Sequence, residues 1–309
     1  MSKMALYVLK RVLLGLLSVW LIITFTFFAM HAIPGGPFQK EKAVTEATRI
    51  ALEQKYGLDK PVHEQYFNYL KGIVTEFDFG PSLTNRGRDV IDVMADGFKV
   101  SAKLGLIAAG LAIVTGLVLG SVAAIFRNKA VDRIIMIVTT AFVAMPAFIA
   151  GSLLLVFISV KMKWLPANGT TAKGLILPVI TLMLYPMAYI TRLTRSSLLD
   201  VLGQDYIRTA RAKGVSGVKV LFKHALKNAC IPVITYAGPM IAYIITGSLV
   251  VEKIFAVPGI GRTFVSSIID RDYMMIMGTT IFLAMVIIVM NIICDLLYKV
   301  FDPRIDFDK

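Results

Sequence analysis

The chain has 309 residues, of which 57% are hydrophobic and only 17% carry a formal charge, and its mean hydropathy is +0.73. Soluble globular domains are about 45–50% apolar and about 25% charged, so this composition excludes an ordinary soluble fold. The net charge of +13 does not require nucleic acid as a partner, because a basic cytoplasmic face beside anionic membrane lipid accounts for most of it.

Six stretches without a formally charged residue follow one another along the chain. An apolar stretch of about 18 residues or more crosses the hydrocarbon core of a bilayer as a helix, and lipid offers no partner for backbone polar groups, so each stretch is expected to be helical. A signal peptide is the alternative for the first stretch, which is too long for that reading and is expected to remain as an anchor. The stretches are 12–30, 104–126, 134–160, 174–191, 230–251 and 273–294.

The distribution of Lys and Arg predicts the orientation. With the N-terminus in the cytoplasm, the inside segments carry 17 of these residues and the two short outside loops carry 6, as the positive-inside rule requires. We therefore expect an all-α membrane protein with six transmembrane helices and cytoplasmic N- and C-termini. Its expected parts are a first segment and helix (1–31), an extracytoplasmic loop or cap (32–99), a five-helix core (100–301) with a cytoplasmic loop (192–229), and a cytoplasmic tail (302–309).

The six stretches contain no Asp, Glu, Lys, Arg or His. Ion-coupled carriers keep such groups at membrane depth, so a self-powered carrier is disfavoured, and the sequence has no potassium-channel filter motif. It also has no G-x-x-x-x-G-K-[ST] loop for binding nucleotide. We expect a non-enzymatic chain without catalytic residues, metal or cofactor of its own, which takes its energy from another protein.

Small residues and prolines mark the expected contacts between helices. Gly116 and Gly120 form a G-x-x-x-G pair, which permits close approach of another helix. In the fifth stretch two prolines and two tyrosines recur at intervals of four, three and four residues and share one helical face. This face is a candidate lining of a translocation path, and a packing seam between helices is the more ordinary interpretation. Its residues are Pro232, Tyr236, Pro239 and Tyr243.

The loop 192–229 carries eight basic residues and predicts two short helices. The first begins near Asp205 as a cap and ends at Gly214, a natural left-handed terminator. The second begins at Ser216 and has an apolar stripe. It would lie at anionic headgroups or in a groove of a soluble cytoplasmic partner. The stripe consists of Val218, Leu221, Phe222, Ala225 and Leu226.

The stretch 205–214, which reads DYIRTARAKG, resembles the coupling loop of permease subunits of bacterial ABC importers, in the form typical of the peptide and nickel branch. The general signature of these subunits is E-A-A, three residues, Gly, nine residues and I-x-L-P. Aligned on Gly214, this chain matches it at Ala210, Gly214 and Leu226 and differs at Arg208, Thr209, His224 and Lys227.

Further strings similar to that branch are spread over nearly the whole chain. Most of them lie in the segments expected outside the membrane, which contain turn-forming and aromatic residues. The outer segment 32–99 is interpreted either as a docking surface for a binding protein or as a lid that seals the outer rim. The strings are 34–38 (PGGPF), 56–61 (YGLDKP), 78–82 (DFGPS), 252–255 (EKIF), 258–261 (PGIG), 271–273 (RDY) and 302–304 (DPR).

The resemblance implies a type I ABC importer permease fold in the bacterial plasma membrane. A second, homologous permease subunit would complete the pathway, two cytoplasmic ATPase subunits would bind ATP and Mg²⁺, and an extracytoplasmic binding protein would deliver oligopeptides. A dipeptide or nickel permease is the near alternative; a self-standing channel or carrier and a membrane scaffold are alternatives from other classes. The residues implied for coupling to the ATPase are Arg208, Thr209, Ala210, Gly214, Leu221, Phe222 and Leu226.

Overall fold

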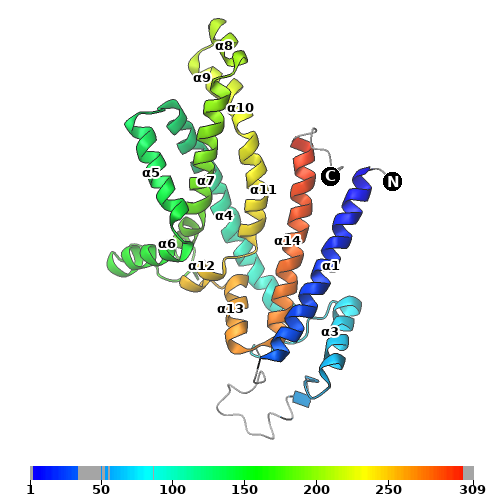
Figure 1. The fold of residues 1–309 in the computed structure, drawn as a ribbon. Coiled ribbons are helices and arrows are strands. Elements are labelled where there is room, and N and C mark those ends of the chain that lie inside the picture. The colour runs from blue at the N-terminus through cyan, green and yellow to red at the C-terminus, as the bar shows by residue number, and fades with distance from the viewer. Residues whose placement is uncertain (1–2, 34–49, 51–52, 55, 86, 302–309) are drawn as a thin grey trace. The chain divides into compact units, whose positions relative to one another are not determined.

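The computed structural model describes residues 3–33, 50, 53–54, 56–85 and 87–301, and most of these are helical (Figure 1). Among them, one isolated β-bridge pairs Pro81 with Asp89. The chain folds as two compact units. The first contains the residues up to Val100 and Pro258–Val289, and the second contains Ser101–Val257 and the residues from Met290 onward.

Five helical segments in the described part of the chain are long and apolar enough to cross a membrane. They coincide with five of the six stretches predicted from the sequence, although several extend beyond them. The segments are α1 (Lys3–Ala32), α4 (Val90–Ile125), α7 (Ile176–Leu202), α11 (Ile231–Ile245) continued by α12 (Leu249–Ile254), and α14 (Tyr273–Phe301).

The third predicted stretch is not one straight helix. Its residues form α5 (Ala130–Ala144) and α6 (Ala147–Leu154), which meet at an angle of 106°, and α6 continues as the π-helix η1 (Leu155–Lys161). Pro146 stands at the break, and it has no N–H group and disfavours helical backbone in the residue before it. The proline thus interrupts a stretch that is helical on both sides of it, and the count of six spans holds when the bent pair is taken as one.

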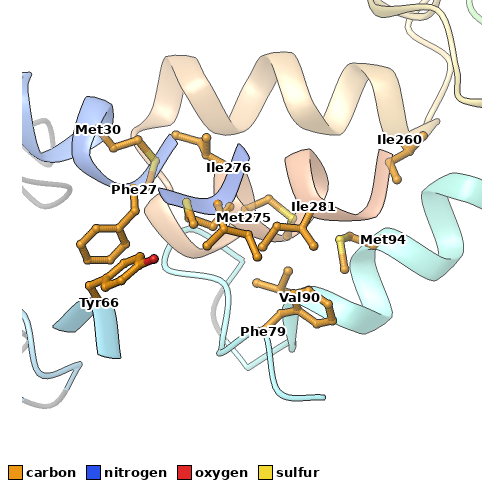
Figure 2. Packing of buried hydrophobic residues seen from close by; sticks show 12 residues of the cluster. Phe27, Met30, Tyr66, Phe79, Val90, Met94, Ile260, Met275, Ile276 and Ile281 are labelled. Atoms are coloured by element: carbon orange, nitrogen blue, oxygen red, sulfur yellow. The ribbon is translucent and has the colours of Figure 1, made fainter. Parts of the chain in front are cut away.

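The first unit has a core built from α1, α3 (Val62–Glu76), α13 (Ile260–Asp270) and the first parts of α4 and α14. Figure 2 shows Phe27 of α1 beside Tyr66 of α3, with ring centroids 5.4 Å apart. Because α4 begins at Val90, the end of the predicted outer segment 32–99 is already part of a long helix. The buried core residues are Ile23, Phe27, Met30, Tyr66, Phe79, Val90, Met94, Ile260, Met275, Ile276, Met277 and Ile281.

In the second unit, α4 packs closely against α7 through glycines. A Cβ atom at Gly116 would lie 2.7 Å from Ile190 Cγ2, and one at Gly120 would lie 2.6 Å from the carbonyl oxygen of Thr191. Real Cβ atoms do not approach so closely, so only glycine fits at these two positions. The predicted close helix contact is confirmed.

Three of the predicted features fall outside the described residues. They are the string 34–38, the string 302–304 and the tail 302–309, which is the last of the expected parts.

Candidate functional site

The loop 192–229 is helical from its first residues, because α7 continues to Leu202. After Gly203, the helix α8 (Asp205–Ala212) begins behind Gln204, whose backbone is extended. Asp205 was expected to cap this helix and instead lies in its first turn. A carboxylate there still favours the helix, since it faces the positive end of the helix dipole.

Gly214 ends this first short helix as the sequence predicted. Its φ angle is +78°, and a Cβ atom at this position would meet nothing within 4 Å. The N–H group of Gly214 donates to the carbonyl of Arg211 at 2.9 Å, and that of Val215 donates to Ala210 at 3.2 Å. The turn therefore needs glycine for its backbone conformation rather than for space.

The second predicted helix forms, and it contains a π-helical turn. It consists of α9 (Gly217–Lys219), η2 (Val220–Ala225) and α10 (Leu226–Ala229), behind Ser216 at the N-cap position. A π-turn pairs residues five apart, so Val220 and Ala225 are buried together. The predicted stripe is only partly available to lipid or a partner: Val218 and Phe222 are 70% and 64% exposed, whereas Ala225 is buried and Leu221 and Leu226 are half-buried.

Both short helices pack on the end of α7 and form one folded body, the coupling body (203–229). In Figure 1, α8 and α9 lie at the far end of the hairpin that α7 and α11 make. Tyr206 of α8 accepts a hydrogen bond from Asn228 Nδ2 of α10 at 2.8 Å, a contact that no sequence pattern indicated. The buried core that these helices share with the ends of α4 and α7 consists of Ala124, Leu198, Ile207, Val220, Ala225 and Ala229.

The exposed surface of the coupling body combines apolar and basic side chains. Phe222, Val218 and Tyr206 are exposed apolar groups, and the exposed cations around them are Arg208, Arg211, Lys213, Lys219 and Lys223. Such a surface is complementary to a groove on another protein that has an apolar floor and acidic residues at its rim. Of the residues implied for coupling, Arg208, Thr209, Gly214 and Phe222 are exposed, while Ala210, Leu221 and Leu226 are half-buried.

The candidate path residues lie on α11 and meet aromatic residues of α7. Tyr236 is half-buried and its ring centroid is 4.3 Å from that of Tyr189, which in turn stacks with Tyr185 at 6.5 Å. Pro232 is half-buried as well, whereas Pro239 is exposed and Tyr243 is 79% exposed. The predicted face therefore extends onto α7, which the sequence pattern of α11 alone did not show.

Two residues of the string 252–255, Glu252 and Phe255, make buried structural contacts. Glu252 is fully buried, and its carboxylate accepts a hydrogen bond from Ser101 Oγ at 2.6 Å. The carbonyl of the equally buried Phe255 accepts a bond from the N–H group of Gly169 at 2.6 Å. These contacts join α4, α12 and the loop after η1 within the second unit.

Comparison with known proteins shows to which family this chain belongs. The family model described as "Binding-protein-dependent transport system inner membrane component" matches residues 116–307, and the N-terminal membrane component of the same systems matches residues 4–95. The chain belongs to this family. With its apolar helices, it is a multi-pass inner-membrane protein.

Relatives from this family match the chain over nearly its whole length. The dipeptide transport system permease protein DppB of Bacillus subtilis is 47% identical, covering 99% of both chains. The oligopeptide transport system permease protein OppB of Escherichia coli is 39% identical, covering 97% of this chain and 99% of the relative.

Chains in solved structures of ABC transporters have a fold similar to that of this chain. A chain of the inward-facing MetNI methionine ABC transporter matches with a TM-score of 0.56 at 16% identity, covering 69% of this chain and 97% of that one. A chain of an amino acid ABC transporter crystallised with histidines matches with a TM-score of 0.53, covering 70% and 95%. This likeness shows the permease fold of ABC importers.

Proposed function

We propose that this chain is a permease subunit of an ATP-driven importer that carries oligopeptides across the bacterial plasma membrane. Residues 100–301 form half of the pathway, and a second homologous permease subunit forms the other half. Two cytoplasmic ATPase subunits move the coupling body, and an extracytoplasmic binding protein docks on the outer segment 32–99 and delivers the peptide. Membrane lipid surrounds the apolar helices.

The observation that carries this proposal is the exposed apolar and basic surface of the coupling body. Phe222 is 64% exposed on a folded body that is continuous with α7, a membrane-spanning helix. A soluble partner that binds Phe222 therefore gains a mechanical connection to the membrane helices. Relatives named as dipeptide and oligopeptide permeases support peptide as the substrate.

The chain acts without catalysis of its own in this proposal, and ATP and Mg²⁺ bind to the partner subunits. Reconstitution into lipid vesicles tests whether transport requires the ATPase subunits. Vesicles with the complete transporter take up labelled peptide only with ATP, and vesicles with this chain alone take up none. Peptide or ion movement through the isolated chain without nucleotide would establish a self-standing channel or carrier instead.

Substrate preference separates an oligopeptide permease from a dipeptide or nickel permease. Both dipeptide and oligopeptide permeases occur among the relatives, at 47% and 39–40% identity. Competition for uptake of a labelled pentapeptide distinguishes them: unlabelled tri- to pentapeptides compete strongly for an oligopeptide importer. Stronger competition by dipeptides or by nickel would assign the transporter to one of those two classes.

The tyrosine-bearing face of α11 is the proposed lining of the path. Its phenol groups place hydroxyls on a predominantly apolar helix, where they offer hydrogen bonds to a passing peptide backbone. Tyr243, which is 79% exposed, is the most accessible of them. Pro232, Tyr236 and Pro239 lie on the same face.

A further inference from the structure

An ion pair between the buried Asp132 and the partly exposed Arg195 joins α5 to α7 in the second unit. Arg195 donates from Nε to Asp132 Oδ1 at 2.6 Å and from Nη2 to Oδ2 at 2.7 Å. The N–H group of Asn128 adds a third hydrogen bond to Oδ2 at 2.9 Å. Asp132 is only 3% exposed, so both carboxylate oxygens are held by fixed donors away from solvent.

The position of this pair connects it to the coupling body. Arg195 lies one helical turn before Leu198, which is buried in the core of the coupling body. Asp132 lies in the first turn of α5, just after the turn that follows α4. Ala124 in the last turn of α4 is buried in that same core. The start of α5 is therefore attached to α7 by an ion pair, and the end of α4 is attached to the coupling body by an apolar contact.

The pair is better suited to fixing a geometry than to adding stability. Burying two charges costs about as much free energy as their attraction returns, and apolar residues of similar size often stabilise a fold equally well. A forked guanidinium–carboxylate contact, by contrast, holds two helices in one register. Lysine or a longer apolar contact does not reproduce that geometry.

We propose that Asp132 and Arg195 are positioning residues that transmit displacement of the coupling body to α5. This inference rests on the proposed function, since it assumes that an ATPase moves the coupling body. When α7 moves, the forked contact makes the start of α5 move with it. The movement then reaches the break at Pro146 and the helix α6, so that the bent pair α5 and α6 follows the coupling body as one lever.

Reconstituted complete transporter in proteoliposomes tests the proposal, with peptide uptake per ATP hydrolysed as the readout. We expect Asp132→Asn and Arg195→Gln to keep ATP hydrolysis and to lower uptake per ATP about fivefold, a typical effect of breaking a coupling contact. Arg195→Lys should lie between these variants and the wild type, because it keeps the charge and loses the fork. Unchanged uptake per ATP in both single variants overturns the proposal.

A double variant separates positioning from stability. Each single variant leaves one charge without its partner, the buried Asp132 or the partly exposed Arg195, which lowers stability by itself. Asp132→Leu combined with Arg195→Met removes both charges. We expect this double variant to recover thermal stability and complex assembly while uptake per ATP stays low. Recovery of uptake per ATP together with stability overturns the proposal, and this test holds even where the single variants fail to assemble.

Two further variants complete the comparison. Asp270→Asn removes an exposed carboxylate outside the segment 32–99, the coupling body and the proposed path, and should leave uptake per ATP unchanged. Phe222→Glu tests the coupling surface itself. If Phe222→Glu lowers uptake per ATP while the Asp132 and Arg195 variants keep the wild-type value, only the ion-pair proposal is rejected. Wild-type behaviour of Phe222→Glu rejects the proposed function.

Discussion

The carboxylate of Asp272 accepts a hydrogen bond from Ser82 Oγ at 2.7 Å, although the two residues are 190 positions apart. The same carboxylate accepts bonds from the N–H and hydroxyl groups of Thr84, at 3.0 and 2.8 Å, and from the N–H group of Met275 at 3.1 Å. Asp272 is fully buried. It therefore caps α14 and holds the outer segment around Ser82 in the first unit, which gives the strings 78–82 and 271–273 a shared structural role.

Replacing Asp272 should destabilise the first unit. We expect Asp272→Asn to lower the free energy of unfolding by about 2 kcal/mol, because the amide turns an N–H group toward buried donors that lose their acceptor. Thermal unfolding of the purified protein in detergent measures the change. The exposed neighbour Asp270 supplies the control, since Asp270→Asn should change stability by less than about 0.5 kcal/mol. Equal stability of the two variants contradicts this role of Asp272.

Close packing between α4 and α7 makes a second prediction. Gly120→Ala places a methyl group 2.6 Å from Thr194 Cβ and should cost about 1–3 kcal/mol of stability through overpacking. Gly110 is the matched control on the same helix, because a Cβ atom there meets nothing within 4 Å. Gly110→Ala should be neutral or slightly stabilising. Thermal unfolding compares the two, and a similar loss in both variants would argue against a specific contact at Gly120.

The turn at Gly214 gives a prediction about backbone conformation. Gly214→Ala should destabilise the coupling body by about 1–2 kcal/mol, the cost of a left-handed conformation for a residue with a Cβ atom. Hydrogen exchange of the α8 amides measures this loss. Gly217→Ala is the control: its site is equally open, it has no positive φ angle and it lies in a helix, so exchange should stay the same or slow down. Faster exchange in Gly217→Ala alone would contradict the account.

The coupling surface predicts binding of a soluble partner. Phe222→Glu should weaken binding of the ATPase subunits about 30-fold, because an exposed aromatic anchor at the centre of an interface contributes about 2 kcal/mol. Phe67 of α3 is 65% exposed and lies outside the coupling body, so Phe67→Glu should bind the ATPase normally. Co-purification at several ATPase concentrations provides the affinities. Equal affinities for both variants would leave Phe222 without a role in the contact.

If the tyrosine-bearing face of α11 lines the path, a change there should reduce transport and leave assembly of the transporter intact. Tyr243→Ala removes a side chain that is 79% exposed, so stability should change by less than about 0.5 kcal/mol while peptide uptake falls. Tyr243→Phe, which lacks only the hydroxyl, shows how much of the effect comes from hydrogen bonding. If Tyr243→Ala instead prevents the second permease subunit from assembling, the face is a packing seam and the path lies elsewhere.

Local rules made several parts of the structure predictable from the sequence. Membrane helices satisfy their own backbone hydrogen bonds, so apolar stretches without charge indicated the spans directly. The end of α8 at Gly214 depends on a φ angle that glycine adopts without strain. The close contact at Gly116 and Gly120 follows from the absence of side chains there. Each of these features is decided by one residue or one short stretch.

The sequence by itself thus determined that this protein is helical and crosses a membrane, and where its coupling body turns. Only the tertiary structure decided the buried partners of Asp272 and Asp132. The physical reason is that these features depend on groups far apart in the chain. Arg195 is 63 positions from Asp132, and no periodicity or local preference of either residue specifies that their side chains meet.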